Sequence, residues 1–151
     1  SRFTILQFLI FFILSPGILA EQNLTPQEAA LIDLTNIERL KKGLQPLKAN
    51  TQLMQAPRDY SALMTIVGKL THSLHGKSFA SRIKKSGYDY RRVGENVARS
   101  KECFPHVMKL WMKSHGHRNN ILNPEFDEIG VGIGVTKKGD RYFTQLFGKQ
   151  R

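Results

Sequence analysis

The chain is poor in cysteine and in acidic residues, and both shortages narrow what it can be. Its single cysteine, Cys103, excludes an internal disulfide framework and any zinc or iron–sulfur site built from several thiolates. Only 12 Asp and Glu residues stand against 23 Lys and Arg residues in 151, which gives a formal net charge of +11. This charge leaves three kinds of partner open: nucleic acid, an anionic envelope surface, or none in particular.

The chain also lacks the patterns of two common catalytic sites. No serine stands in a Gly-x-Ser-x-Gly elbow, and Cys103 lies in no recognisable nucleophile motif. The alternating glycines at 130, 132 and 134 do not predict a phosphate loop, because no helix is expected after them and no Lys-Ser/Thr pair follows. Nothing in the sequence therefore indicates a nucleophilic hydrolase or a P-loop enzyme.

An apolar segment opens the chain and has the organisation of a secretory signal. Arg2 precedes an apolar run over residues 3–14, helix breakers follow at 15–17, and Ala20 supplies a small residue. This pattern predicts a signal peptide over residues 1–20. The run is shorter than the roughly 20 apolar residues of a membrane span, although an uncleaved N-terminal anchor is the alternative.

Cleavage after Ala20 leaves a single domain over residues 21–151, with a net charge of +10 because Arg2 is the only charged residue lost. An exported protein meets envelope polymers and anionic lipid before it meets genomic DNA. We therefore expect an anionic envelope polymer or lipid as partner, and no nucleic acid. In that setting Cys103 is expected to be a buried, inert thiol, with pairing to another chain as the alternative.

Helical signals dominate the first part of this domain. Thr25 and Glu28 form a capping box, and Gly43 supplies a stop. The apolar positions of this first helix recur at Ala30, Leu34, Ile37 and Leu40. Further helices are expected over residues 53–69, 79–86 and 105–113, the last with Val107, Leu110 and Trp111 facing inward.

Strand patterns are concentrated near the C-terminus. Residues 129–135 alternate glycine with β-branched residues, which predicts a strand with another element packed closely against its glycine face. A turn at 138–140 leads to a returning strand over 142–147, and residues 93–98 form a brief apolar segment. Because helices come first and strands mostly last, the fold class is α+β with a small antiparallel sheet.

Three short segments gather most of the residues that can carry chemistry. They are Thr71-His72-Ser73-Leu74-His75-Gly76, Gly94-Glu95-Asn96-Val97-Ala98, and Ser114-His115-Gly116-His117-Arg118-Asn119-Asn120-Ile121-Leu122-Asn123-Pro124. Together with Asn36-x-x-Arg39-x-x-x-Gly43-Leu44-x-Pro46-Leu47, residues 129–132 and residues 142–148, they resemble the CAP superfamily. That superfamily contains the cysteine-rich secretory proteins, antigen 5 and the plant pathogenesis-related proteins. The resemblance covers roughly residues 24–148 and is to the small bacterial, secreted branch.

The resemblance implies a three-layer α-β-α sandwich with a cleft on one face. In the family this cleft is lined by two histidines and one or two acidic residues, and His72, Glu95 and His117 match those positions. Ser114 stands where many eukaryotic members carry the second acid, and His115 where bacterial relatives usually carry proline. The expected cleft residues are therefore His72, Glu95, Ser114 and His117.

Two imidazoles and a carboxylate can do three kinds of work. His72, His117 and Glu95 can hold a divalent metal such as zinc, Glu95 can serve as a general base, or the three can hold loops together across the cleft. We expect a secreted binding module, extracellular or periplasmic, whose cleft takes a divalent ion. The alternatives are a metal-assisted hydrolase of protein or wall polymer with Glu95 as its base, and, by the resemblance, a lipid or sterol carrier.

The positive charge is concentrated in one stretch. Residues 69–101 contain nine Lys and Arg residues against Asp89 and Glu95, a net charge of +7 in 33 residues. Because this stretch also carries His72, we expect the charge to lie along the cleft rim. There it would attract a lipid headgroup, a teichoic-type polymer or an acidic peptidoglycan fragment. The alternative is a solvated basic surface that serves only solubility.

Overall fold

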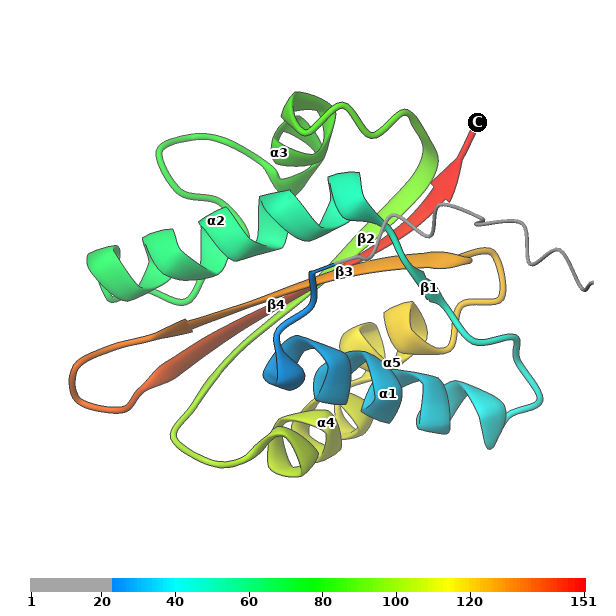
Figure 1. The fold of residues 1–151 in the computed structure, drawn as a ribbon, viewed down its shortest axis with the longest axis horizontal. Helices are drawn as coiled ribbons and strands as arrows, with labels where there is room; N and C mark the ends of the chain where they lie inside the picture. The colour runs from blue at the N-terminus through cyan, green and yellow to red at the C-terminus, as the bar shows by residue number, and fades with distance from the viewer. Residues whose placement is uncertain (1–22) are drawn as a thin grey trace, which may run out of the picture.

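A mixed sheet lies between two helical layers in the computed structural model, which describes residues 23–151 (Figure 1). The predicted signal peptide over residues 1–20 lies outside the described residues. The strands are β1 (Lys48–Ala49), β2 (Tyr90–Ser100), β3 (Glu128–Val135) and β4 (Arg141–Gln150), and their order in the sheet is β1-β3-β4-β2.

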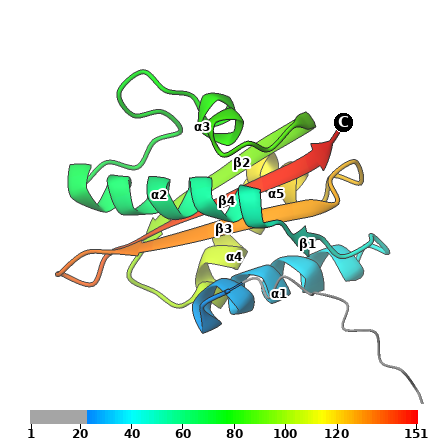
Figure 2. The ribbon, with the colours of Figure 1, turned by 45° about the horizontal axis from the view of Figure 1, so that its top comes forward.

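The helices divide between the two faces of this sheet (Figures 1 and 2). Those on one face are α1 (Pro26–Leu40), α4 (Phe104–Lys113) and α5 (His115–Ile121), and those on the other are α2 (Thr51–Val67) and α3 (Phe79–Lys85). This arrangement confirms the predicted α+β sandwich with helices on both sides of the sheet.

The long strands are antiparallel, as the sequence predicts, and β1 adds a short parallel pair. Strand β4 pairs with β3 on one side and with β2 on the other, and Lys48 and Ala49 pair in parallel with the start of β3. Neither β1 nor α5 is predicted from the sequence, and β2 is longer than the apolar segment 93–98. Its central residues Glu95 and Asn96 lie opposite Leu146 and Gln145.

Helix α1 begins as predicted but buries a different face. The Thr25 side chain accepts a hydrogen bond from the Glu28 amide, and the Glu28 carboxylate accepts one from the Thr25 amide. Two of the expected apolar positions are wrong as core positions, because Ile37 and Leu40 are 47% and 58% exposed. The face that packs inward carries Leu31, Ile32, Thr35 and Arg39.

A buried arginine explains part of this difference. The Arg39 guanidinium donates hydrogen bonds to four main-chain carbonyls, those of Gln45, Ile121, Asn123 and Phe126, at 2.8–3.1 Å. A buried cation needs this many acceptors to offset the loss of water. In return, Arg39 fixes the connection from α5 to β3 against α1.

Helix α2 packs directly on the glycine face of β3, as the alternating glycines predict. A Cβ atom added at Gly132 would lie 2.1 Å from the carbonyl oxygen of Pro57. The helix starts at Thr51, with Asn50 as its N-cap, and it runs through Pro57 without interruption.

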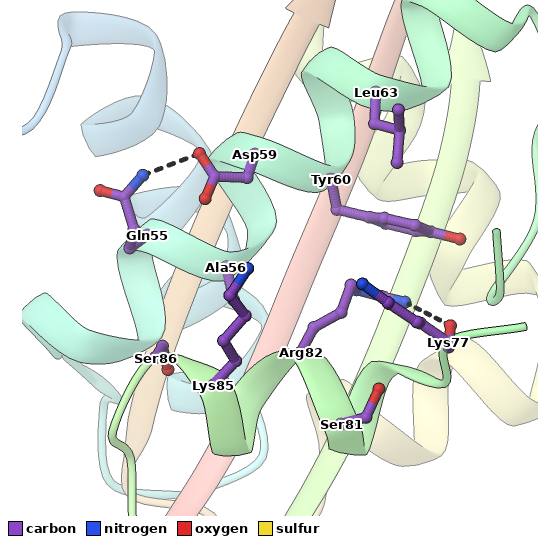
Figure 3. A pocket seen from close by; sticks show the side chains of 10 residues that line it. All are labelled: Gln55, Ala56, Asp59, Tyr60, Leu63, Lys77, Ser81, Arg82, Lys85 and Ser86. Carbon is purple, nitrogen blue, oxygen red and sulfur yellow. Dashed lines mark hydrogen bonds between the residues drawn. The ribbon is translucent and has the colours of Figure 1, made fainter. Parts of the chain in front are cut away.

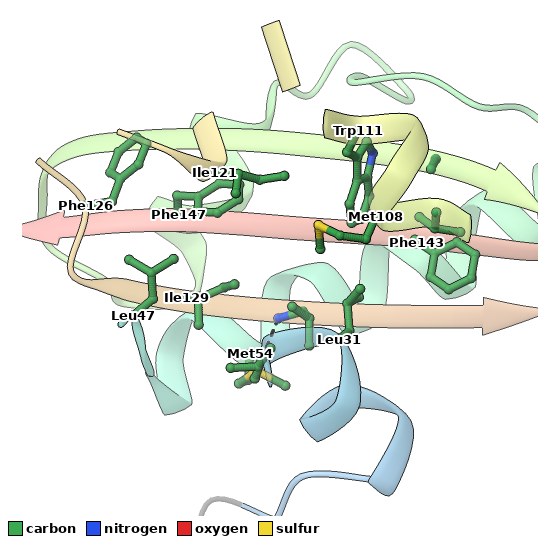
Figure 4. Close-up of a cluster of buried hydrophobic side chains, with 14 residues drawn as sticks. Leu31, Leu47, Met54, Met108, Trp111, Ile121, Phe126, Ile129, Phe143 and Phe147 are labelled. Carbon is green, nitrogen blue, oxygen red and sulfur yellow. Dashed lines mark hydrogen bonds between the residues drawn. The ribbon is translucent and has the colours of Figure 1, made fainter. Parts of the chain in front are cut away.

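The main core lies between the sheet and the helices α1, α4 and α5 (Figure 4). Trp111 of α4 is buried, and its indole N–H donates to the Val97 carbonyl at 3.2 Å. Two expectations for this region are wrong. Leu110 of α4 does not face inward but is 43% exposed, and Cys103, just before α4, is an exposed free thiol rather than a buried one. Within residues 23–151, none of the helices has the length and apolar character that crossing a bilayer requires.

The close contact between α2 and β3 makes a stability prediction. Gly132→Ala would force the helix and the strand apart against backbone atoms, so we expect it to lower the free energy of unfolding by about 3 kcal/mol or more. Gly116→Ala is the matched control, because a Cβ atom there meets no atom within 4 Å. Urea denaturation of both variants measures the difference, and equal stabilities would contradict the packing described here.

Candidate functional site

The site is built around the carboxylate of Glu95, in the middle of β2. Its side chain is 0% exposed. The Nδ2 group of Asn120, from α5, donates to the Glu95 carbonyl at 3.1 Å and to the side chain of Asn96 at 2.9 Å. A helix from one layer thus holds the backbone of the strand that presents this carboxylate.

Arg82 of α3 supplies the countercharge. Its guanidinium donates to one Glu95 carboxylate oxygen and, at 3.0 Å, to the main-chain carbonyl of His72. It also stacks on the ring of Tyr60, with its central carbon 3.4 Å from the ring centroid. The sequence prediction missed Arg82, because an arginine in a short helix rich in lysine has the pattern of a solvated residue.

His72 binds the second carboxylate oxygen of Glu95. Its Nδ1 lies 3.0 Å from Oε1, and its ring is more than half exposed. The hydrogen bond to Glu95 raises the pKa of His72 above the usual value for histidine, although burial and the charge of Arg82 oppose this change. His72 and Arg82 therefore share the two oxygens of one buried carboxylate.

His117 lies on α5, at the other side of β2. Its imidazole is partly buried, and within residues 23–151 it forms no hydrogen bond or ion pair. Burial lowers the pKa of His117 below the usual value, and the charge of His72 lowers it further. Its main-chain carbonyl accepts a hydrogen bond from Asn96 at 3.1 Å, which fixes α5 against β2.

The remaining predicted cleft residue, Ser114, lies at the junction of α4 and α5. Its side chain caps neither helix and makes no hydrogen bond to the other three cleft residues of the described chain. His115 is exposed. It lies on α5 two residues before His117, and residues two apart on a helix face different sides. The structure thus joins His72 and Glu95 directly, places His117 within reach of the charge of His72, and leaves Ser114 at the margin.

A metal site formed by His72, Glu95 and His117 is not assembled in this arrangement. Both carboxylate oxygens of Glu95 are already bound, one by His72 and one by Arg82. Across residues 23–151 no group of three or more His, Cys, Asp or Glu side chains is placed to hold a metal ion. Glu95 does not fit the role of a direct ligand while Arg82 holds it.

The basic stretch divides into paired and unpaired charges. Three of its nine cations form ion pairs: Arg82 with Glu95, Arg92 with Glu125, and Arg99 with Asp140. The other six form none within the described part of the chain: Lys69, Lys77, Lys84, Lys85, Arg91 and Lys101. Lys101 lies beyond the far end of β2, about 30 Å along the strand from Arg91. The charge is thus concentrated on α3 and the loop before it, where Lys77, Lys84 and Lys85 are all exposed.

Comparison with known proteins identifies this arrangement. The sequence profile of the cysteine-rich secretory protein family, CAP, matches residues 32–147. The chain belongs to the CAP family. It is 36% identical over 132 residues to the protein YkwD of Bacillus subtilis (strain 168), covering 86% of this chain and 50% of YkwD. This CAP chain therefore spans about half the length of that relative.

Two solved structures share the CAP fold and come from bacteria. An outer surface protein from Borrelia burgdorferi has a TM-score of 0.77 at 25% identity, over 82% of this chain and 92% of that chain. An extracellular protein containing an SCP domain from Bacillus anthracis str. Ames has a TM-score of 0.72 at 26% identity, over 84% and 44%. The CAP chain described here is thus related to bacterial proteins of the outer surface and the extracellular space.

The two histidines are expected to titrate in opposite directions. Protonated His72 stabilises the folded chain, so its contribution is present below the usual histidine pKa, about 6.5, and is lost as pH rises through its raised pKa. His117 has a lowered pKa, so its protonation costs stability as pH falls below about 6.5. NMR titration of the ring protons should give His72 the higher pKa of the two.

Glu95→Gln tests the cause of this difference, because it should bring the pKa of His72 down. Glu102→Gln is the matched control, since Glu102 is exposed and lies outside the site. If His72 titrates at or below His117 in the unmodified chain, the pairing of His72 with Glu95 is wrong.

Proposed function

We propose that this CAP protein is an exported binding module, extracellular or periplasmic, that holds an anionic component of the cell envelope. The observation that carries the proposal is the state of Glu95. Its carboxylate is shut off from solvent and bound by His72 and Arg82, so it serves to hold the site together. The unpaired lysines on α3 and the loop before it then give the site its affinity for anions.

The hydrolase alternative requires Glu95 to act differently. A general base must lie within hydrogen-bond reach of the water or substrate proton that it removes. Glu95 has no exposed side-chain surface, and its two oxygens are already engaged, one by Arg82 and one by His72. For Glu95 to act as the base, Arg82 would first have to move away from it. The buried Glu95 carboxylate would then have lost its countercharge, which is costly.

The anion is best matched by the exposed lysines around α3. Lys77, Lys84 and Lys85 lie close together in sequence, next to the segment that carries His72, and none is neutralised by a carboxylate of the described chain. Clustered unpaired cations attract polymers with repeated phosphate or carboxylate groups, and the attraction weakens with added salt. An envelope polymer or an anionic lipid surface has this chemistry, and nucleic acid remains unexpected for an exported protein.

Binding to immobilised poly(glycerol phosphate) tests this proposal. We expect binding at low salt that falls steeply as salt is added. The double variant Lys84→Gln, Lys85→Gln should weaken binding by about 2 kcal/mol, roughly thirtyfold, at low salt. Lys109→Gln makes the same kind of charge change on α4, on the other face of the sheet, and should have little effect. Binding that does not change with salt concentration, or no binding at low salt, would contradict the proposal.

A divalent ion held by His72 and His117 is the second candidate, and one observation favours it. Glu95 holds Nδ1 of His72, which leaves Nε2 as the ring nitrogen available to a metal. A carboxylate that orients a histidine in this way is the usual support of a metal-binding imidazole. His117, whose pKa is lowered, is neutral at neutral pH, as a ligand must be. A bound ion would supply positive charge for an anionic ligand or, in the hydrolase alternative, Lewis acidity.

Zinc titration by calorimetry decides the second candidate. His72→Ala and His117→Ala should each abolish zinc binding, and Glu95→Gln should weaken it by about 10- to 100-fold through loss of orientation. His106→Ala is the control, since His106 is exposed on α4. An equal loss of zinc binding in all three histidine variants would indicate that zinc binds at scattered surface histidines.

The carrier alternative is tested separately, by solvent extraction of the purified protein and a search for lipid or sterol.

A further inference from the structure

A groove lies between α2 and α3 (Figure 3), and two of the lysines assigned above to the anion, Lys77 and Lys85, also line it. Its volume is about 510 Å³, within the range of pockets that bind small molecules. One wall is a face of α2 that carries Gln55, Asp59 and Leu63. The other wall consists of Lys77 from the preceding loop and Ser81 and Lys85 of α3.

The floor of the groove is apolar, and contacts hold its side chains in place. Ala56 and Tyr60 of α2 are both buried, and the Tyr60 hydroxyl is held by a hydrogen bond to the Thr71 carbonyl at 2.7 Å. Arg82, which also lines the groove, stacks on the Tyr60 ring and is anchored by Glu95. An apolar floor whose side chains are already held by such contacts is a preformed surface for the side chain of a ligand.

Opposite charges face each other across this floor without pairing. Asp59 stands on the α2 wall, where its carboxylate accepts a hydrogen bond from Gln55 of the same helix at 2.8 Å. Lys85 extends from α3 toward α2 in Figure 3, and Lys77 stands at the other end of the groove. Neither lysine forms an ion pair with Asp59, or with any other acid of residues 23–151.

We propose that this groove binds a short peptide with free termini. Its ammonium group would face Asp59, its carboxylate would lie against Lys85, and an apolar side chain would cover Ala56 and Tyr60. A ligand with only a carboxylate, such as a fatty acid, would leave Asp59 facing an alkyl chain with its charge unpaired. A zwitterion is the class of ligand that pairs the charges on both walls.

Calorimetry with the dipeptide Leu-Ala and its two capped forms tests the proposal. The free dipeptide should bind best. Acetylation of its amine removes the partner of Asp59, and amidation of its carboxylate removes the partner of Lys85. Because these wall charges are exposed, each cap should weaken binding about fivefold.

Matched variants assign each charge to its wall. In the Asp59→Asn variant, acetylation of the dipeptide should no longer weaken its binding. In the Lys85→Gln variant, amidation should no longer weaken it. Lys84→Gln is the control, because Lys84 is the next residue on α3 and does not line the groove. All three side chains are exposed, so the variants are expected to fold.

The groove proposal is wrong if the free dipeptide does not bind, or if octanoate binds more tightly than the dipeptide. It is also wrong if Lys84→Gln and Lys85→Gln lower the affinity for the dipeptide equally. The proposed function fails by a different result. Binding of poly(glycerol phosphate) should respond to Lys84→Gln as much as to Lys85→Gln, since it depends on the charge of the whole cluster. The two proposals can therefore stand or fall separately.

Discussion

The buried carboxylate of Glu95 is the constraint on which the site depends. A charge with no contact to solvent is tolerated only when cations and hydrogen bonds replace the water it has lost. Arg82 and His72 do this, and both come from the segment between α2 and β2. That segment also buries Leu74, Ile83 and Tyr88, so the ion pairs and these side chains together decide where it lies. The placement of this segment in turn sets the position of α3, of its lysines and of the groove beside it.

The site lies where the two helical layers meet at an edge of the sheet. Strand β2 is an outer strand, and His72 reaches it from the side of α2 whereas His117 reaches it from α5 on the other side. An edge strand exposes unpaired backbone groups and invites pairing with other chains, which charged residues discourage. Arg91, Arg92 and Arg99 on this strand are suited to that role.

The sequence predicts this fold well where the signals are local and poorly where packing decides. The capping box at Thr25 and the glycine face of β3 depend on short-range geometry, and both are found as expected. Periodicity alone cannot say which stripe of a helix docks, and so it assigns Ile37 to the core although this side chain is exposed. The resemblance to CAP proteins supplies His72 and Glu95. It does not supply Arg82, whose role emerges only when α3 is folded against β2.

The order of the strands has a consequence for how the chain is made. Strand β4 comes last in the sequence of strands, yet it lies between β3 and β2 and pairs with both. Neither β2 nor the long pairing face of β3 has a partner until residues 141–150 have left the ribosome. Partly synthesised chains therefore cannot close the sheet, and folding must wait for these contacts between distant segments. The sheet stays incomplete until that strand has emerged.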